Sequence, residues 1–263
     1  MPPNLKPKSG DEASGQGILE FDKCHVWWAR PSVGPLRFHL LEQSLSPTEL
    51  HQAASFRFPK DRLAYIFRHG VLRNILGCYL GIKPREVCFS IQPGGKPQLQ
   101  PSSNPLDLRF NISRTEDMAL FALTRSCEVG VDIESVQPLP DRESIARVAL
   151  SRRELEVLSS LPEEERMVAF FRGWTRKEAM LKALGDGIGA GTSHLDVNLA
   201  DRGNTGITGS YEFRLDGSTS CPWSLFDLLP APGFAGAVAI RASGLRLVCR
   251  PWLECGNPAA AII

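Results

Sequence analysis

The sequence predicts an α+β protein: a pseudo-dimer of two similar halves, each a small, mostly antiparallel sheet packed with a long helix. Both halves show the same order, a strand-like run followed by helices and then by two or more strands. Each half also contains one long helical stretch, over residues 61–80 and 162–184. The apolar run 118–123 has a weakly similar counterpart over 236–240. Elements in this order form layered domains in which helices cover one face of a sheet.

Length and composition allow this architecture. The 263 residues suffice for one large domain or two small ones, and 43% hydrophobic residues can form a full core. We expect a flexible tail over 1–20, an N-terminal half over 21–129, a C-terminal half over 130–254 and a second tail over 255–263. The formal net charge of +1 gives no overall attraction to nucleic acid or acidic membranes, so any anion site must be a local cluster.

The sequence contains no apolar run long enough for a membrane span, and it has seven cysteines. Their number is odd and no two form a C-x-x-C pair, which argues against zinc and against a disulfide framework. We interpret them as small buried hydrophobic residues of a reducing compartment. The sequence therefore predicts a cytoplasmic monomer that binds neither nucleic acid nor a membrane.

Local signals predict the elements of the first half in order. Residues 24–29 form a strand rich in aromatic and β-branched side chains. The run 46–49, Ser-Pro-Thr-Glu, is a capping box that opens a helix. Apolar residues at helical spacing predict a longer helix over 61–80, which ends at Gly81. Further strands are predicted over 87–91, 108–112, 118–124 and 128–134, with a turn over 93–97 that carries one lysine.

The second half begins with a loop that contains two prolines, at 138 and 140. The capping box 151–154 opens one helix, and acidic residues at 163–165 open the longest helix, which ends at Gly185. We interpret the glycine-rich run 185–191 as a helix stop and flexible loop, because a phosphate-binding loop would precede a helix instead of ending one. The remaining strands are predicted over 211–215, 223–229, 235–240 and 245–249.

Two acidic residues alternate with apolar residues in the run Gly-Val-Asp-Ile-Glu, residues 130–134. On a strand, Asp132 and Glu134 point to one face, while Val131 and Ile133 point into the core. Two neighbouring carboxylates repel each other, and their oxygens suit a hard cation such as Mg²⁺. The same pattern also occurs on an ordinary solvated sheet face, and taken alone it favours that interpretation.

A second polar group lies in the run Trp-Thr-Arg-Lys-Glu-Ala-Met-Leu-Lys, residues 174–182. In a helix, Glu178 and Lys182 lie one turn apart on the same face, with Trp174 one turn earlier. The glutamate can serve as a metal ligand or a base and the lysine can bind phosphate, but a surface ion pair explains the spacing equally well. Composition leaves both interpretations open.

The two runs together resemble the paired signature motifs of the 4′-phosphopantetheinyl transferases, of the long, two-halved type that activates nonribosomal peptide, polyketide and fatty acid synthases. Gly95-Lys96-Pro97, the run 110–113 and the helical region 56–73 follow in the order that this family shows. The resemblance covers residues 20–250. It implies that a serine hydroxyl of an apo acyl or peptidyl carrier protein attacks the β-phosphate of coenzyme A, so that 3′,5′-adenosine bisphosphate leaves.

The resemblance also implies roles for individual residues. Asp132, Glu134 and Glu178 would hold Mg²⁺ against the pyrophosphate, with Glu178 as the base for the serine proton. Lys177 and Lys182 would neutralise phosphate charge. The other expected contacts to coenzyme A are those of Lys96, Ser113, Arg114, Arg57, Arg62 and Arg73.

The sequence departs from the family pattern at two places. Arg114 stands where the family usually has a histidine, and an arginine can also pair with a phosphate. Glu49 and Gln52 stand where some relatives carry lysines toward the 3′-phosphate of coenzyme A, so Arg57, Arg62 or Arg73 is expected to take that role. Two alternatives stay open: a non-catalytic scaffold that binds coenzyme A or carrier domains, and a Mg²⁺-dependent pyrophosphate hydrolase.

Overall fold

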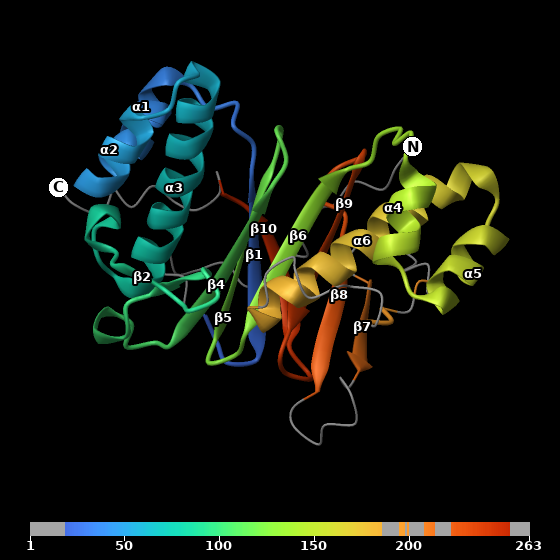
Figure 1. The fold of residues 1–263 in the computed structure, drawn as a ribbon. Coiled ribbons are helices and arrows are strands. Elements are labelled where there is room, and N and C mark those ends of the chain that lie inside the picture. Colours follow the sequence, from blue (N-terminus) through green and yellow to red (C-terminus); the bar gives the residue numbers. More distant parts are fainter. Residues whose placement is uncertain (1–18, 186–194, 198, 200–207, 214–221, 253–263) are drawn as a thin grey trace, which may run out of the picture.

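Two four-stranded sheets form the centre of the molecule, with helices on their outer faces (Figure 1). The computed structural model describes residues 19–185, 195–197, 199, 208–213 and 222–252. The second expected tail, nearly all of the first, and the glycine-rich run beyond Gly185 lie outside these residues. The observed α+β architecture of two halves confirms the predicted fold class.

The first sheet has the strand order β10-β1-β5-β4. Its strands are β1 (Lys23–Ala29), β4 (Leu108–Arg114), β5 (Ala119–Arg125) and β10 (Arg246–Pro251). Strand β5 runs antiparallel to both β1 and β4, whereas β10 runs parallel to β1. Helices α1 (Pro35–Gln43), α2 (Pro47–Ala54) and α3 (Pro59–Leu80) form the helical layer of this half, and a two-stranded hairpin, β2 (Phe89–Ile91) and β3 (Pro97–Leu99), follows them between the short 3-10 turns η1 (Pro84–Glu86) and η2 (Pro101–Ser103).

The second sheet is antiparallel and has the order β6-β9-β8-β7. Its strands are β6 (Val129–Ser135), β7 (Thr208–Phe213), β8 (Trp223–Leu228) and β9 (Phe234–Ile240). The long helix α6 (Glu163–Leu184) packs on this sheet, and α4 (Arg142–Ala149) and α5 (Arg152–Ser160) lie beyond it (Figure 1).

The strand pairing is repeated between the halves. In the first half β5 lies between β1 and β4, and in the second half β9 lies between β6 and β8, with antiparallel pairing in both. The two apolar runs that suggested a repeat are therefore β5 and β9, and nearly every residue of both is buried. The division of the chain at residues 129 and 130 stays a prediction, and β10 crosses back from the second half to pair with β1.

Side chains from both sheets meet in a common core between them. Strands β1, β5, β6, β8 and β9 contribute to it with Cys24, Val26, Met118, Leu120, Ala122, Val129, Val131, Ile133, Phe226, Leu228, Val238 and Ile240. A second core lies between the first sheet and α1–α3, and further cores lie beneath α6. The order of layers is thus helix, sheet, sheet, helix.

The predicted helix signals are confirmed. Ser46 and Ser151 each accept the backbone N–H three residues later and complete a capping box with a glutamate. Gly81 and Gly185 end α3 and α6 in the left-handed conformation, which glycine adopts without a steric penalty.

Two α-helices and one strand were not predicted, namely α1, α4 and β3, and neither were the short turns η1 and η2. Helix α1 has no capping side chain at Gly34, and β3 is only three residues long. Helix α4 lies in the region that we expected to be a loop. It starts directly after the prolines, Asp141 before its first residue makes no side-chain capping bond, and its buried residues are the small Ala146 and Ala149.

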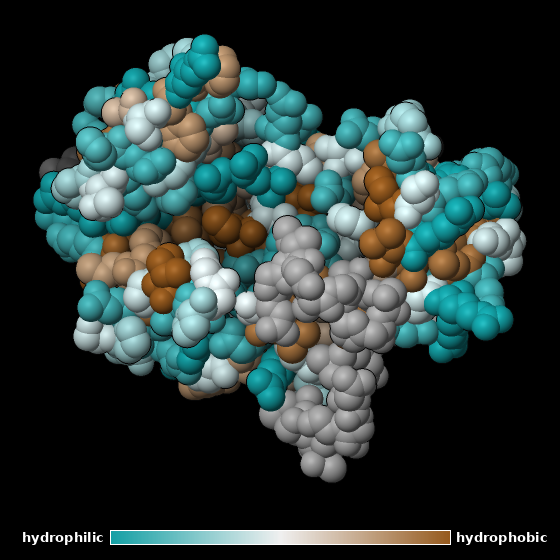
Figure 2. All heavy atoms as spheres, in the orientation of Figure 1, coloured by the Kyte–Doolittle hydropathy of each residue, from teal (hydrophilic) through white to brown (hydrophobic). Residues whose placement is uncertain are grey.

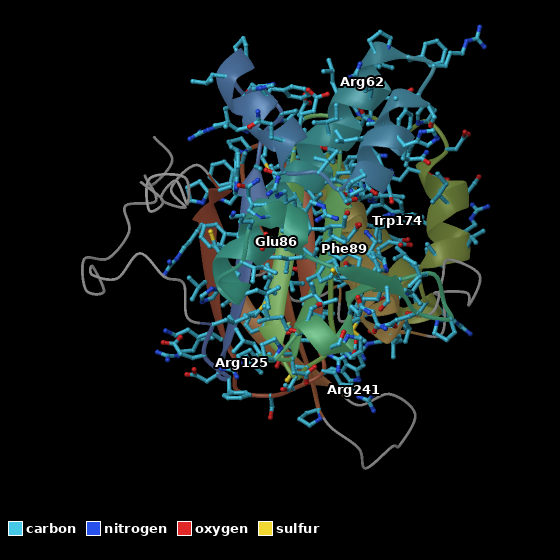
Figure 3. The ribbon with its side chains drawn as sticks, turned by 90° about the vertical axis from the view of Figure 1, so that its left-hand side faces the viewer. Arg62, Glu86, Phe89, Arg125, Trp174 and Arg241 are labelled. Atoms are coloured by element: carbon cyan, nitrogen blue, oxygen red, sulfur yellow. The ribbon has the colours of Figure 1, made fainter. Side chains whose placement is uncertain are left out.

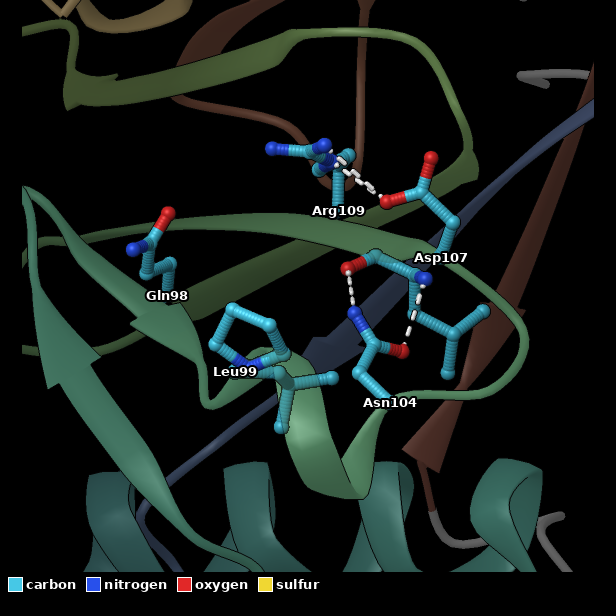
Figure 4. Close-up of a pocket in the computed structure, with 7 residues that line it drawn as sticks. Gln98, Leu99, Asn104, Asp107 and Arg109 are labelled. Atoms are coloured by element: carbon cyan, nitrogen blue, oxygen red, sulfur yellow. Dashed lines mark hydrogen bonds and ion pairs between the residues drawn. The ribbon is translucent and has the colours of Figure 1, made fainter.

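A cavity of about 230 Å³ lies beside the β2–β3 hairpin (Figure 4). Arg109 pairs with Asp107 at its rim, and the Asn104 side chain bonds both backbone groups of Leu108. These polar groups are already paired with each other, so none of them requires a ligand as a partner. Among the described residues, no helix has the length and apolar character needed to cross a membrane.

Helix α6 crosses β6 at Gly130 in a backbone-to-backbone contact. A Cβ atom at this position would lie 2.0 Å from the Ala179 carbonyl oxygen and 2.4 Å from the Ala183 nitrogen. Both atoms belong to the helix backbone, so no side chain can move aside. Glycine at this position therefore sets how closely α6 approaches the strand that carries the two acids.

We expect Gly130→Ala to lower the free energy of unfolding by about 3 kcal/mol, because the added methyl group forces α6 away from β6. Chemical denaturation monitored by circular dichroism measures the change. Gly34→Ala is the control, since nothing lies within 4 Å of its added Cβ, and it should cost less than about 1 kcal/mol. Equal losses of unfolding free energy for the two substitutions would contradict the close approach of α6 to β6 at Gly130.

Candidate active site

Strand β6 places its acidic residues on one face, as its alternating pattern predicts. Val131 and Ile133 are fully buried in the core between the sheets. Asp132 and Glu134 point to the opposite face, where α6 packs: Lys182 contacts Asp132, and the Trp174 side chain hydrogen-bonds Glu134. The two signature runs therefore meet across the β6–α6 contact.

The edge strands β4 and β6 belong to different sheets and are joined by two side chains of β4. The Asn111 Oδ1 atom accepts the Val131 N–H at 2.9 Å, and the Ser113 Oγ atom accepts the Ile133 N–H at 3.3 Å. These hydrogen bonds satisfy two backbone N–H groups of β6 that would otherwise need the carbonyl groups of a neighbouring strand. Sequence analysis assigned Ser113 to coenzyme A and gave Asn111 no role, although both belong to the same Asn-x-Ser motif.

Lys182 lies where the two halves meet. Its Nζ atom is 2.6 Å from Asp132 Oδ1 and 3.0 Å from the Ser113 hydroxyl, which in turn donates to the same carboxylate oxygen at 2.9 Å. Asp132 is buried, while the Lys182 side chain remains 30% exposed. The structure thus brings three predicted site residues into direct contact.

The two glutamates share this electrostatic environment. Burial, and then the Asp132 charge, raises the pKa of Glu178, while Lys182 opposes the shift. Burial, followed by Asp132, also raises the pKa of Glu134, although Trp174 and Lys182 lower it. The three carboxylates therefore act on one another, and Lys182 balances part of their charge.

The donor set fits a hard divalent cation by its chemistry. Asp132 Oδ2 is buried and has no hydrogen-bond partner, which is an unfavourable state for a carboxylate oxygen unless a further ligand binds it. Carboxylate oxygens are the ligands that Mg²⁺ prefers. Within the described part of the chain, no three His, Cys, Asp or Glu side chains are arranged so that they could hold a metal as they stand, and Lys182 binds the other oxygen of Asp132.

Lys177 lies away from this group. Its Nζ atom is 2.6 Å from Glu154 Oε2 and 2.9 Å from the Ala149 carbonyl oxygen, and both charged side chains are about 1% exposed. Glu154 also accepts the Val197 N–H, so the pair links α5 and α6 to the segment that ends at Val197. The expected contact of Lys177 with phosphate is not favoured by this position, and the role of Glu154 was not predicted.

Lys96 connects the β2–β3 hairpin to the start of β6. Its Nζ atom donates to the Val129 carbonyl at 3.0 Å and lies 3.4 Å from Glu128 Oε2. The same hairpin touches the end of α6, since a Cβ on Gly94 would lie 2.5 Å from the Gly185 carbonyl oxygen. The predicted contact of Lys96 with coenzyme A stays a prediction, and the structure shows a contact between the halves.

The three arginines expected near the 3′-phosphate lie in different surroundings. Arg73 is buried and binds Glu49 together with the Pro84 and Val87 carbonyls. Arg62 pairs with Glu42 at 2.9 Å near the end of α3 that is remote from Phe89 (Figure 3). Arg57 is exposed and lies over the Phe58 ring. The structure does not bring them together as one site.

Arg114, the residue in place of the usual histidine, ends β4 directly after Ser113 and is exposed. Sequence analysis left its direction undetermined. Its charge lowers the pKa of Arg68 in α3, an effect that comes second to burial of Arg68. Arg114 therefore lies near enough to Arg68 for the two positive charges to repel each other.

Comparison with known proteins gives matches over both halves. A family model described as "4′-phosphopantetheinyl transferase superfamily" matches residues 128–239, and one described as "4′-phosphopantetheinyl transferase, N-terminal" matches residues 29–126. The 4′-phosphopantetheinyl transferase HetI of Nostoc sp. is 36% identical over 85% of this chain and 90% of its own length.

Two further relatives come from other groups of organisms. The L-aminoadipate-semialdehyde dehydrogenase-phosphopantetheinyl transferase of Homo sapiens is 28% identical over 71% of this chain and 62% of its own length. The 4′-phosphopantetheinyl transferase psf-1 of Bacillus pumilus is 29% identical over 57% of this chain and 62% of its own length.

We expect Lys177→Met to lower the free energy of unfolding by about 3 kcal/mol or more, because it leaves the buried Glu154 carboxylate without its cation. Urea denaturation measures this change. Arg152→Met is the matched control, because Arg152 is 96% exposed in its pair with Glu156 and should contribute at most about 0.5 kcal/mol. Unchanged stability combined with weaker binding of coenzyme A would instead support the phosphate role.

The lowered pKa of the Glu49 carboxyl group predicts that the protein loses stability in acid. Burial alone would raise the pKa of Glu49, but hydrogen bonds from His69, the Ser46 N–H and Arg73 lower it from 4.5 to about 2. Because the folded pKa is depressed, the stabilisation is complete above the unfolded value and is lost as the pH falls from 4.5 to about 2.

We therefore expect the difference in unfolding free energy between the wild type and Glu49→Gln to be up to about 3 kcal/mol at neutral pH and to shrink toward pH 2. Denaturation series at several pH values measure it. A difference in unfolding free energy between the two proteins that stays constant down to pH 2 would contradict the lowered pKa of Glu49.

Proposed function

The chain belongs to the 4′-phosphopantetheinyl transferase superfamily, and we propose that Asp132, Glu134 and Glu178 bind Mg²⁺ at the β6–α6 contact where its reaction takes place. The enzyme transfers the phosphopantetheine arm of coenzyme A to a serine of apo carrier-protein domains and releases 3′,5′-adenosine bisphosphate. The observation that carries the site assignment is the contact of Lys182 with both Asp132 and Ser113, because it joins the charged pair of the second half to a hydroxyl of the first half at one point.

Phosphoryl transfer depends on positioning and charge stabilisation more than on covalent help from the enzyme. Mg²⁺, when bound by the three carboxylates, would stabilise the negative charge that develops on the leaving bisphosphate. Lys182 supplies a flexible cation next to the carboxylates and exchanges its contact with Asp132 for one with a substrate phosphate. The Ser113 hydroxyl stays between Lys182 and Asp132 and holds Asp132 in place.

Glu178 is the proposed base. Its raised pKa keeps it a better proton acceptor than an ordinary surface glutamate, and Asp132 beside it contributes to that shift. It accepts the proton of the carrier serine as the oxygen attacks the β-phosphate of coenzyme A. The proton therefore ends on the Glu178 carboxylate, and the phosphopantetheine arm on the serine oxygen.

Three further expectations remain predictions. The balanced net charge supports an enzyme that binds neither nucleic acid nor a membrane surface. The free thiols of Cys24, Cys88 and Cys249 support a reducing, cytoplasmic location. Size-exclusion chromatography with light scattering tests whether the protein is a monomer.

The transfer itself is tested by incubating the protein with an apo carrier protein, coenzyme A and Mg²⁺ and weighing the intact carrier. We expect a gain of about 340 Da, the mass of the arm that the cofactor carries. Chelation of the metal should stop the reaction. Release of phosphopantetheine without any gain in carrier mass would support the hydrolase instead, and binding without reaction would support the scaffold.

We expect Glu178→Gln to reduce the transfer rate by about 10² or more, because it removes the base and one ligand charge while the helix stays folded. The rate is measured by stopping the reaction at set times and weighing the carrier protein, and circular dichroism checks the fold. Glu156→Gln, an exposed glutamate of α5, is the control and should keep the wild-type rate. A wild-type rate for Glu178→Gln would exclude it as the base.

A further inference from the structure

Two ion pairs between α6 and buried acids are closed. Arg176 donates to both oxygens of Asp227, at 2.7 and 2.6 Å. Lys177 binds Glu154, whose two oxygens also accept backbone N–H groups. At most 7% of either acidic side chain is exposed. Every carboxylate oxygen of these two pairs thus has a partner inside the protein, so neither pair needs a ligand.

A third pair of α6, Lys182 with Asp132, is open. Asp132 Oδ1 accepts the Lys182 ammonium at 2.6 Å and the Ser113 hydroxyl at 2.9 Å, but Oδ2 accepts no hydrogen bond. Within the described residues, no other carboxylate oxygen is buried without a hydrogen-bond partner. The Asp132 side chain is 5% exposed, whereas that of Lys182 is 30% exposed. The acid is therefore fixed inside the site, and the lysine is the partner that can leave it.

The contacts of Ser113 allow this exchange. Its hydroxyl donates to Asp132 and accepts the Ile133 N–H at 3.3 Å, and neither bond involves Lys182. Asp132 therefore stays in place when the lysine leaves. A buried carboxylate without a counter-ion is unfavourable, so another cation must take the place of the ammonium.

The ammonium itself needs an anion when it leaves. It is a compact charge on a flexible stem, and phosphate is one of its usual partners. Figure 2 shows hydrophilic side chains beside the hollow that separates the α1–α3 layer from the rest of the molecule. Lys182 contacts both halves, through Ser113 and Asp132, so an anionic substrate that binds between the halves meets this ammonium.

We propose that Lys182 occupies Asp132 in place of Mg²⁺ until coenzyme A binds. This inference rests on the proposed function, in which Asp132, Glu134 and Glu178 bind the metal. The phosphates of coenzyme A attract the Lys182 ammonium away from Asp132, so that Oδ1 becomes available to the metal together with the unpartnered Oδ2. Mg²⁺ and coenzyme A therefore bind cooperatively, and the enzyme without coenzyme A has a low affinity for the metal.

A permanent salt bridge is the alternative. In that case Lys182 would stay on Asp132 throughout the reaction, as Lys177 stays on Glu154, and its removal would leave the metal affinity unchanged. A second alternative is repulsion between the lysine charge and the metal at a distance, without any exchange of contacts. The experiment separates both from the proposal.

The first measurement is the affinity of the protein for Mn²⁺ without coenzyme A. Mn²⁺ takes the same oxygen ligands as Mg²⁺, and its free form is detected by electron paramagnetic resonance. We expect Lys182→Met to bind Mn²⁺ about tenfold more tightly than the wild type or better, because no internal cation competes for Asp132. The control Lys60→Met removes an exposed lysine charge from α3 and should match the wild type.

A second variant covers a failure to fold. Circular dichroism shows whether Lys182→Met is folded. If it is not, Lys182→Gln replaces it, because the amide still donates to Asp132 but carries no charge. This variant should also bind Mn²⁺ more tightly than the wild type.

The dependence on salt separates contact from repulsion at a distance. Separated charges are screened over about 10 Å at 0.1 M salt and about 3 Å at 1 M salt, whereas a buried contact is screened much less. The gain in Mn²⁺ affinity from Lys182→Met should therefore persist from about 0.1 M to about 1 M KCl. A gain that disappears at the higher concentration would overturn the proposal.

The last measurement is the affinity for coenzyme A, determined by calorimetry with Mg²⁺ and with a chelator. The ratio of the two affinities is the coupling factor, which also gives the effect of coenzyme A on metal binding. It should be smaller in Lys182→Met than in the wild type. An equal coupling factor, or a Mn²⁺ affinity that neither Lys182 variant raises, would overturn the proposal.

The carrier-mass assay keeps the two levels apart. A wild type that transfers nothing would refute the proposed function. A wild type that transfers the arm while its Lys182 variants bind Mn²⁺ no more tightly would refute this inference alone.

Discussion

The structure depends on how the edges of its two sheets are joined. Strands β4 and β6 lie side by side without being partners in one sheet, and the side chains of Asn111 and Ser113 accept the backbone N–H groups of Val131 and Ile133. A side-chain acceptor fixes the register of β6 against the first half as firmly as a ladder bond does. Since Asp132 lies between these two anchored residues, the junction between the halves also determines where the first acid of the site is held.

The second determinant is the distance between β6 and α6. Gly130 allows the helix backbone to approach the strand, so that Glu178 and Lys182 reach the face that carries Asp132 and Glu134. Side chains on a helix and a strand meet in this way only when the elements pack closely. The protein can therefore be almost neutral as a whole and still concentrate charge locally, with three acids and one lysine at the contact between β6 and α6.

Much of this could be predicted from the sequence, because the relevant signals are local. Capping residues, helix-ending glycines and the alternation of 130–134 are short-range patterns, and all of them are confirmed. The position of Lys177 could also have been predicted: adjacent residues of a helix point about 100° apart, so Lys177 and Glu178 cannot share one face, whereas Glu178 and Lys182 can.

Other features needed tertiary information. Glu49 follows Ser46 in a capping box, but nothing in the sequence indicates that its carboxylate also binds His69 and Arg73 from another helix. The helices α1 and α4 were missed for a related reason: neither is opened by a capping side chain, and packing against neighbours stabilises them.

The pairing of β10 with β1 has a consequence for the order in which the molecule is completed. Strand β1 is synthesised before all the other described strands, and its outer neighbour β10 is synthesised after all of them. Until residues 246–251 have left the ribosome, one edge of β1 remains open, with aromatic and apolar side chains along it. Open strand edges are templates for wrong pairing. The nascent protein must therefore protect this edge until β10 has been synthesised, and a chain truncated before β10 would carry the exposed edge permanently.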